Sequence, residues 1–441
     1  MGPESPLEER IVQVLRYLGI NRAHVAASMA PDWRGLATRH SDLVTSLTIV
    51  CPTALDPTDL SALASQFIVF TGDRGPQAER LRRSLTGFRD APLIVLPDYR
   101  AETWADVAAD RTREVGGPML EFLQRMDRRD GTKTAALPEG DGEVAGISYR
   151  IRGTGPPLVL FPLALAPSQW EPLLPTLGAH YCTISLGGAA LGMVAYLELR
   201  GRLGYLGAVR SLMDAIGVRP GEVVAEIGCG SGVLIRWLAR QTRGANRILG
   251  IDINGYLLRE AANLAEKDGL ADALTLQQGN AEALPLPDNS VDVAFACTVL
   301  EEGDAEKMLA EMVRVTRPGG RVAVIVRALD ASWWVNLPLR AGLKTKLEVP
   351  GRVASGAAAD GCADASLYRR FHRAGLTQLT LFPYLVPVTK ADPRFTLFQQ
   401  QFLAALDPGE AAEWRSAVTD AEADGTFFMA QPFHCAVGIK P

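Results

Sequence analysis

The stretch Val223-Val-Ala-Glu-Ile-Gly-Cys-Gly-Ser-Gly-Val-Leu-Ile-Arg-Trp-Leu-Ala-Arg240 decides the fold of the C-terminal half of the chain. A short β-branched run leads into Gly228, Gly230 and Gly232, and an amphipathic helical pattern follows. Glycines permit a tight turn without a Cβ, so the backbone can lie against a ligand, and the next helix points its free N–H groups there. The stretch therefore predicts a strand, a ligand-binding loop and a helix.

The spacing of the glycines separates the candidate ligands. A dinucleotide-binding fingerprint requires a third glycine where this chain has Val233. A phosphate-binding P-loop requires a Gly-Lys-Ser/Thr sequence, and this loop has no lysine. Nicotinamide cofactors and ATP are therefore disfavoured.

A second expected strand, RILGIDIN (residues 247–254), ends at Asp252. A carboxylate at the tip of this strand can accept hydrogen bonds from both ribose hydroxyls of a nucleoside. The alternative interpretation is a helix N-cap, because a helical pattern follows directly. We expect the ligand-binding role.

Four motifs in this half resemble the class I S-adenosylmethionine-dependent methyltransferases, especially those of ubiquinone and menaquinone biosynthesis. The motifs are EIGCGSG (226–232), GIDIN (250–254), GNAEALPLPDNSVDVAFA (279–296) and EMVRVTRPGGRVAVIV (311–326). The resemblance implies an α/β fold with a Rossmann-like seven-stranded sheet and S-adenosylmethionine as the cofactor.

By this resemblance, Glu226 neighbours the methionine end of the cofactor, Asp252 holds the ribose and Asn280 faces the adenine. The cofactor-binding residues that it implies are Tyr205, Glu226, Gly228, Cys229, Gly230, Gly232, Asp252, Ile253, Asn280, Ala281, Glu282 and Thr298. The family usually has Asp where this chain has Asn280. An asparagine still accepts a hydrogen bond through its amide oxygen, so we expect weakened rather than lost adenine binding.

Methyl transfer from a sulfonium is an in-line displacement, so the protein mainly supplies alignment and exclusion of water. The reaction also needs a base that takes a proton from the atom that accepts the methyl group. The candidates are Glu301 and Glu302, after the fourth strand, and His434 on the expected last strand. The alternatives are solvated charges at the start of the next helix for the glutamates and burial in the sheet for the histidine.

The acceptor is expected to be a small, apolar or aromatic molecule. Trp333 and Trp334 follow the fifth strand and could line an acceptor pocket, although core packing is an equal alternative. Residues 393–425 have the pattern of inserted helices, which in the family often cap the substrate site. The Asn-Pro-Pro-Tyr signature of many amine methyltransferases is absent from the sequence, which disfavours nucleic-acid bases and protein amines.

The first 130 residues alternate helical and strand patterns, as in a parallel α/β sheet. They resemble the second half of an α/β-hydrolase, with Ser28 of RAHVAASMA at the nucleophile position. The family's acid position holds Gly75, and Asp98-Tyr99 stands where its histidine is expected. A serine without base and orienting acid is not activated, so we expect no hydrolysis.

Residues 145–185 resemble the first half of the same hydrolase fold, so we hypothesise that the two pieces form one sheet in permuted order. The polar, glycine-rich stretch from Asp130 to Gly146 reads as a linker or exposed turn. The expected organisation is a degenerate hydrolase-like region at 1–130, a linker with hydrolase-like strands at 131–204, and a methyltransferase domain with a C-terminal cap at 205–441.

Composition narrows the class of protein. A net charge of −5 argues against a broad nucleic-acid-binding surface. The six cysteines form no CxxC pair, so neither a structural metal nor any other metal site is expected. The polar N-terminus and the lack of a long apolar run predict a cytoplasmic protein without a membrane span.

The sequence therefore predicts a methyltransferase that acts on a small metabolite at carbon or oxygen. Two alternatives stay open. One is a regulatory protein that binds S-adenosylmethionine without turnover, and the other is a serine esterase that uses Ser28. The fold predicts the binding site of the methyl donor but does not identify the methyl acceptor.

Overall fold

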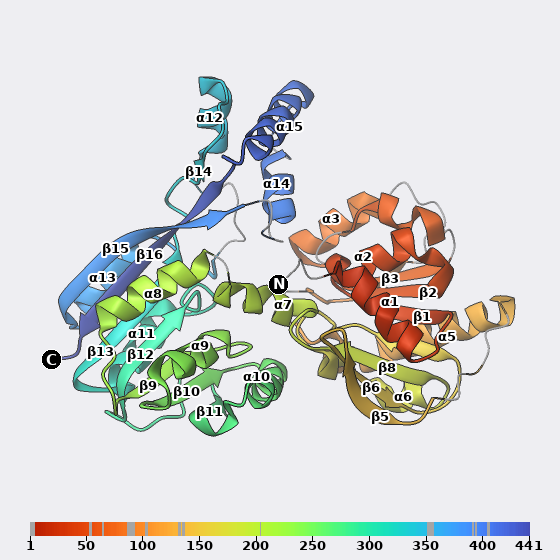
Figure 1. Cartoon of the computed structure of the whole chain (residues 1–441), viewed down its shortest axis with the longest axis horizontal. Helices are drawn as coiled ribbons and strands as arrows, with labels where there is room; N and C mark the ends of the chain where they lie inside the picture. The colour runs from red at the N-terminus through yellow and green to blue at the C-terminus, as the bar shows by residue number, and fades with distance from the viewer. Residues whose placement is uncertain are drawn as a thin grey trace. The chain divides into compact units, whose positions relative to one another are not determined.

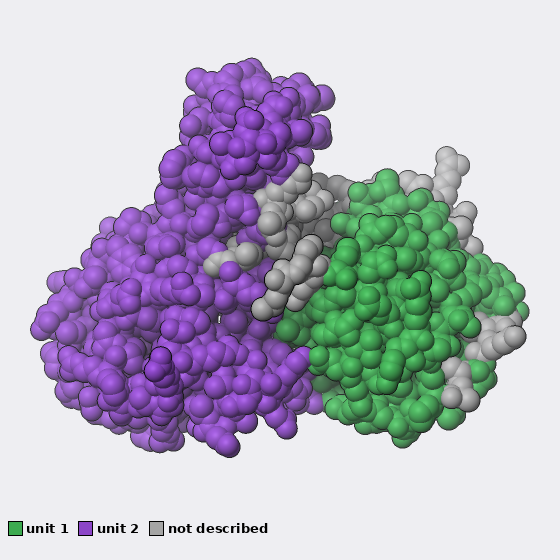
Figure 2. Space-filling view, in the orientation of Figure 1, with its two compact units in different colours: residues 1–196 green, residues 197–441 purple. Residues whose placement is uncertain are grey.

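The computed structural model describes residues 5–52, 55–63, 66–85, 93–101, 105–130, 134, 137–202, 204–350, 357–389, 392, 395–403 and 406–441. The chain forms two compact units, Met1–Tyr196 and Leu197–Pro441, coloured separately in Figure 2. Unit 2 thus begins ahead of the domain start expected at residue 205. Among the described helices, none combines the length and apolar character needed to cross a bilayer.

Unit 1 is built on one eight-stranded sheet with the order β4-β3-β2-β1-β7-β8-β6-β5. Its strands are β1 (Ala23–Ala27), β2 (Val44–Val50), β3 (Phe67–Gly72), β4 (Leu93–Leu96), β5 (Gly140–Val144), β6 (Ile147–Arg152), β7 (Pro157–Leu160) and β8 (Cys182–Gly187). Its helices are α1 (Leu7–Tyr17), α2 (Ala30–Arg39), η1 (Ser41–Leu43), η2 (Pro57–Leu63), α3 (Gly75–Leu85), α4 (Val107–Asp110), α5 (Thr112–Asp130), η3 (Pro167–Trp170) and α6 (Leu174–Gly178).

The central strands of unit 1 are buried throughout because helices cover both faces of the sheet. Every residue of β1, β2 and β3 is buried, as expected for parallel strands between two helical layers. Strand β1 pairs in parallel with β7, where His24 lies opposite Leu158. Residues 145–185 therefore lie in the same sheet as β1 to β4, while their likeness to a hydrolase stays a prediction.

The expected linker from Asp130 to Gly146 contains a strand. Residues 140–144 form β5, which pairs with β6 in an antiparallel hairpin at the edge of the sheet. Ala145 and Gly146 make the turn with positive φ values of 52° and 71°. The glycines and polar residues of this stretch belong to a half-exposed edge strand and its turn, and the linker prediction is wrong there; residues 131–133 and 135–136 lie outside the described residues.

Unit 2 contains the sheet order β11-β10-β9-β12-β13-β16-β14, with β15 paired to β16. Its strands are β9 (Val223–Ile227), β10 (Arg247–Asp252), β11 (Leu274–Gln278), β12 (Val291–Cys297), β13 (Thr316–Arg327), β14 (Trp334–Val335), β15 (Thr377–Val388) and β16 (Met429–Ile439). Strands β9 to β13 are parallel, and β16 runs antiparallel to both β13 and β15. The predicted Rossmann-like sheet is confirmed, with the two-residue β14 added to its seven strands.

Helices cover both faces of this sheet (Figure 1). They are α8 (Tyr205–Ile216), α9 (Val233–Thr242), α10 (Gly255–Lys267), η5 (Ala271–Ala273), α11 (Ala305–Val315) and α13 (Ser366–Arg373). One core packs α8 and α9 against the sheet, and another packs α11 and α13 against the other face. Ahead of α8, α7 (Gly192–Glu198) and η4 (Leu199–Gly201) lead from one unit into the next.

Three more helices form a module with its own core at one end of the long strands β15 and β16 (Figure 1). They are α12 (Ala341–Leu347), α14 (Phe395–Leu403) and α15 (Pro408–Ala423). Their shared core contains Trp333, Phe398, Phe402 and Trp414. Helices α14 and α15 fall in the segment 393–425 where inserted helices were predicted; residues 393–394 and 404–405 lie outside the described residues.

Candidate cofactor site

The glycine loop follows the buried end of β9 and precedes α9. Gly228, Gly230 and Gly232 have positive φ values of 74°, 54° and 73°, a conformation that costs other residues free energy. The N–H groups of Gly228 and Cys229 both donate to the carbonyl of Ile251, which fixes the loop to the end of β10. A Cβ on Gly228 would lie 2.3 Å from Cγ2 of Val299, so only glycine fits there.

Asp252 is the last residue of β10, and its side chain is hydrogen-bonded to the glycine loop. Its Oδ2 accepts a hydrogen bond from the Gly230 N–H at 2.7 Å, and its Oδ1 accepts one from the Asn254 N–H at 2.8 Å. Burial raises the pKa of this carboxyl, and the two hydrogen bonds oppose that rise. The N-cap of α10 is Asn254, whose side chain accepts from the Leu257 N–H, so the N-cap interpretation of Asp252 is wrong.

Glu226 lies inside β9 next to the loop and is 2% exposed. Its Oε2 has no hydrogen-bond partner among the described residues, and the buried Tyr205 hydroxyl has none of good geometry either. Burial raises the pKa of the Glu226 carboxyl well above its ordinary value, and the positive charge of Arg200 opposes this. A buried acceptor without a donor costs free energy, so this atom is suited to a ligand that donates a hydrogen bond.

The turn after β11 borders the same edge of the sheet. The Gly279 N–H donates to the Asp252 carbonyl, and the Asn280 Oδ1 accepts from the Glu282 N–H at 2.9 Å. Asn280 is exposed, and its oxygen thus shapes the turn in addition to any contact with adenine. Next to Asp252, Ile253 is 65% exposed and offers an apolar surface to a planar base. Ala281 lies half-buried in the turn.

Thr298 directly follows the last residue of strand β12 and has a positive φ of 59°. This conformation is strained for a β-branched residue, and such strain is often found at functional sites. The Thr298 N–H donates to the Ile325 carbonyl, so the strained residue is anchored to the neighbouring strand β13. The structure thereby brings Glu226, Asp252 and Thr298, three of the predicted cofactor residues, to the carboxyl ends of adjacent strands.

The two predicted glutamate bases differ in environment. Glu301 is 1% exposed, and its two oxygens accept hydrogen bonds from the N–H and the Nε–H of Arg327. Burial raises the pKa of Glu301, and Arg327 opposes the rise. The solvated interpretation is therefore wrong for Glu301, which joins the segment after β12 to the last residue of β13 in a largely buried ion pair. Glu302 is exposed, ahead of α11.

His434, the third predicted base, lies on β16 opposite Val326. The Tyr368 hydroxyl is 2.9 Å from its Nδ1, and Oδ1 of Asp330 is 2.8 Å from its Nε2. Both ring nitrogens therefore have partners, and the network ties α13 to the sheet. Sequence patterns did not indicate Tyr368, because its link to His434 exists only in three dimensions.

The two tryptophans after β13 separate into core and surface. Trp333 is buried in the helical module, with its ring 4.8 Å from that of Phe398 in an edge-on arrangement. Trp334 is 47% exposed and meets Phe428 edge-on at 5.3 Å. Core packing thus accounts for Trp333, whereas Trp334 presents an aromatic surface.

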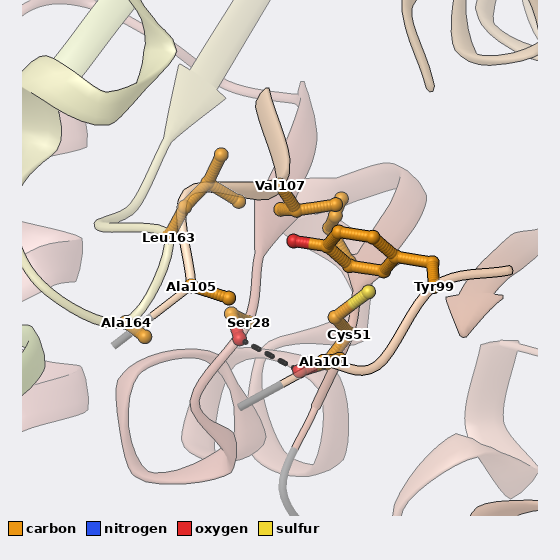
Figure 3. Close-up of a pocket in the computed structure, with 9 residues that line it drawn as sticks. Ser28, Cys51, Tyr99, Ala101, Ala105, Val107, Leu163 and Ala164 are labelled. Carbon is orange, nitrogen blue, oxygen red and sulfur yellow. Dashed lines mark hydrogen bonds between the residues drawn. The ribbon is translucent and has the colours of Figure 1, made fainter. Parts of the chain in front are cut away.

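Ser28 of unit 1 lines a cavity of about 20 Å³ with Cys51, Tyr99 and Leu163 (Figure 3). Its Oγ donates to the Cys51 carbonyl at 3.4 Å, and no histidine lines the cavity in the part of the chain that the structure describes. The Tyr99 hydroxyl, at the position expected for a hydrolase base, donates to Asp110. A carbonyl cannot take a proton from the serine, so these contacts provide no activation. Among the described residues, no group of metal-ligating side chains could hold an ion.

The loop, the acidic strand end and the parallel sheet define unit 2 as a Rossmann-like nucleoside-binding fold with its site at the carboxyl ends of the strands. Residues 225–324 match the family model described as "Methyltransferase domain". This segment is a class I S-adenosylmethionine-dependent methyltransferase domain, and the predicted class is confirmed.

Known proteins are similar to part of this chain. The chain is 38% identical over 117 residues to the ubiquinone/menaquinone biosynthesis C-methyltransferase UbiE of Hahella chejuensis. This alignment covers 26% of this chain and 47% of that protein. It is 39% identical over 110 residues to the sterol 24-C-methyltransferase ERG6B of Gibberella zeae, covering 25% of this chain and 28% of that protein. The chain thus spans less than half the length of these curated relatives.

Among solved structures, the YcgJ protein of Bacillus subtilis aligns with 53% of this chain and 98% of its own. The sequence identity is 17% and the TM-score is 0.36. The [4+2]-cyclase SpnF aligns with 54% of this chain and 84% of its own, at 24% identity and a TM-score of 0.34.

Proposed function

We propose that this protein transfers the methyl group of S-adenosylmethionine to a small, apolar or aromatic acceptor at carbon or oxygen. The observation that carries the proposal is the glycine loop, whose three glycines have left-handed conformations and whose Gly230 N–H donates to the Asp252 carboxylate. A bare backbone turn beside an acid on the neighbouring strand suits a nucleoside whose ribose hydroxyls need acceptors.

The residues present fit S-adenosylmethionine from end to end. At the methionine end, the unpartnered Glu226 Oε2 can accept a hydrogen bond from the α-ammonium group. At the nucleoside end, Asp252 can accept from the ribose, and the exposed Ile253 can pack against the adenine. The absence of Cβ atoms at Gly228, Gly230 and Gly232 lets the backbone approach the ligand between these ends.

When bound, the cofactor supplies a methyl group already activated by the sulfonium charge. The chain's own residues then have to align the acceptor and keep water out. We infer that Glu301 contributes by fixing the ends of β12 and β13 through Arg327. Glu302 and His434 remain candidate bases, although the nitrogens of His434 are already bonded to Tyr368 and Asp330.

An apolar acceptor is favoured by the aromatic helical module and by the relatives. Trp334 and Phe428 present aromatic surface at the strand ends that carry the module. The similar proteins are named as C-methyltransferases of ubiquinone/menaquinone biosynthesis and of sterols. The negative net charge favours a small molecule over a nucleic acid as the methyl acceptor. We also propose that the enzyme is located in the cytoplasm.

Turnover with a mixture of acceptors tests this proposal. The protein is incubated with S-adenosylmethionine and a panel of quinols, phenols, prenyl compounds and sterols, and S-adenosylhomocysteine is measured by mass spectrometry. We expect acceptor-dependent product from the wild type and at least about tenfold less from Asp252→Ala, because a lost hydrogen-bonding pair weakens cofactor binding. Cofactor binding without transfer to any acceptor would favour the regulatory alternative.

A further inference from the structure

The segment 197–201, called the strap here, lies directly on the glycine loop. The carboxylate of Glu198 in the strap is buried, accepts a hydrogen bond from the Ser231 hydroxyl at 2.7 Å and pairs with the Arg236 guanidinium. Ser231 belongs to the loop itself, and Arg236 belongs to the first turn of α9. The strap is thus bonded to the loop and to the helix that follows it.

Packing contacts hold the two ends of the strap to the loop. Leu197 Cδ1 would lie 2.8 Å from a Cβ placed on Gly230, and Val233 Cγ2 would lie 2.6 Å from a Cβ placed on Gly201. Close approach at both ends leaves no room for side chains at these glycines. The strap is therefore closely packed against the loop and the start of α9.

This position brings the charge of Arg200 to the methionine end of the site. The guanidinium donates to the Cys297 carbonyl at the end of β12 at 3.4 Å, and it lies 5.2 Å from the centre of the Tyr205 ring. Its positive charge also acts on the buried Glu226 carboxyl, where it opposes the effect of burial on the pKa. A cation and a buried acceptor, Arg200 and Glu226, thus face the same end of the glycine loop.

Two such groups complement a zwitterion. A guanidinium binds a carboxylate through a planar fork of donors, and a carboxylate accepts from an ammonium group. We propose that Arg200 binds the α-carboxylate of the cofactor while Glu226 accepts from its α-ammonium, and that Glu198 is the positioning residue that holds the strap and Arg200 in place. This inference rests on the proposed function. Residues 197–201 precede the segment 225–324 that matches the methyltransferase family.

Two ligands that differ only in the amino-acid group of the cofactor test the inference. S-Adenosylhomocysteine carries the zwitterionic amino-acid group, and 5′-methylthioadenosine has the same thioether nucleoside without it. Both are titrated calorimetrically into the full-length wild type, Arg200→Ala, Arg200→Lys and Glu198→Gln. The exposed Arg202, two residues further along the chain, supplies the matched control Arg202→Ala.

We expect Arg200→Ala to weaken S-adenosylhomocysteine by about 10- to 100-fold, the range for a charge-assisted hydrogen bond, and to leave 5′-methylthioadenosine within about threefold of wild type. Arg200→Lys keeps the charge and should recover part of the loss. Glu198→Gln should shift the ratio of the two affinities in the same direction but less, and Arg202→Ala should not shift it.

Unchanged binding of both ligands by Arg200→Ala, or an equal loss for both, would overturn the assignment. An equal loss would mean that the arginine only maintains the fold of the strap. Failure of the wild type to bind S-adenosylhomocysteine at all would instead contradict the proposed function, so the two outcomes are distinguishable.

Discussion

Two buried carboxylates flank the glycine loop, and they differ in how their oxygens are satisfied. Both oxygens of Asp252 accept backbone N–H groups, whereas Oε2 of Glu226 has no partner among the described residues. The first acid therefore shapes the loop before any ligand arrives. Glu226 instead has an acceptor oxygen that is available to a ligand. This oxygen lies in a low-dielectric environment, where a hydrogen bond to a charged donor is strong.

Cofactor binding should become tighter as the pH rises. Burial raises the pKa of Glu226, so in the ligand-free protein this carboxyl keeps its proton to a higher pH than usual. The α-ammonium of the cofactor favours the ionised carboxylate, so binding releases a proton and gains affinity as the group ionises. Calorimetry of S-adenosylhomocysteine between about pH 6 and pH 8, in buffers of different ionisation enthalpy, measures both effects.

Glu226→Gln is the control for this prediction. The glutamine retains an acceptor but cannot titrate, so the pH dependence and the proton release should both diminish. Wild-type affinity that is flat with pH and without proton release would contradict the role given to Glu226.

The residues of the site divide into those that local sequence could reveal and those that it could not. Glu226, Gly228 and Asp252 belong to a strand, a loop and a strand end whose spacing is itself the signal. Arg200 lies outside any such pattern, because its position depends on the packing of the strap over the loop. Arg327 was likewise missed, since its pairing with Glu301 requires two strands to end side by side.

At the scale of elements, the glycine loop keeps its conformation because its glycines have no Cβ atoms at the points where neighbouring side chains contact the backbone. Gly228 combines a φ of 74° with a neighbour, Val299, that already fills the space a Cβ would need. The end of β12 is correspondingly strained at Thr298. Strand ends and loop thus form one closely fitted edge, at which a small displacement alters the ligand site.

Gly228→Ala should therefore weaken cofactor binding by at least about tenfold, because the loop must move to relieve both a collision and about 1–2 kcal/mol of backbone strain. Gly221→Ala is the matched control, since Gly221 has a φ of 86° and no atom within 4 Å of its added Cβ. Both variants should lose thermal stability, and calorimetry with S-adenosylhomocysteine separates them. Equal affinities for the two variants would show that the fit at Gly228 is unimportant.

The elements themselves were largely predictable. Strands β9, β10 and β12 and the helices between them carry apolar runs and periodicities that identify them locally. Residues 140–144 were misread as part of a linker or exposed turn, because the composition of a half-exposed edge strand resembles that of a linker. Only the pairing of β5 with β6 distinguishes the two cases.

At the scale of the whole molecule, two units with separate cores divide the chain between Tyr196 and Leu197. The pairing of β1 with β7 joins segments far apart in the sequence of unit 1, and no local pattern encodes such a pairing. The hydrolase resemblance suggested it. Among the described residues that line the cavity at Ser28, none could activate the serine. We therefore propose that unit 1 acts as a scaffold or partner surface without hydrolytic activity.

Unit 1 carries a buried acid that should make its stability depend on pH. Asp32 in α2 accepts hydrogen bonds from the Gly192 N–H on both oxygens at 3.2 Å. Burial raises its pKa to about 7, and the hydrogen bond from Gly192 opposes the rise. The folded state thus favours the protonated form, so the contribution of Asp32 is greatest at low pH and is lost as the pH rises from about 4 to about 7.

Asp32→Asn should remove this loss and raise the stability of unit 1 at about pH 8 by roughly 1–3 kcal/mol relative to wild type. Denaturant unfolding of the full chain at about pH 5 and about pH 8, with a probe in unit 1, measures the difference. The exposed Asp42 provides the control Asp42→Asn. Identical pH slopes for wild type and Asp32→Asn would contradict this assignment.

The central claim is that the glycine loop and Asp252 bind S-adenosylmethionine. Calorimetric titration of the full-length protein with S-adenosylmethionine and S-adenosylhomocysteine tests it directly, with Asp252→Ala and the exposed-site control Asp272→Ala. We predict binding of both ligands to wild type and control, and a loss of about 1–3 kcal/mol or more in Asp252→Ala. A wild-type protein that ignores both ligands, or an Asp252→Ala variant that binds them unchanged, would contradict the account.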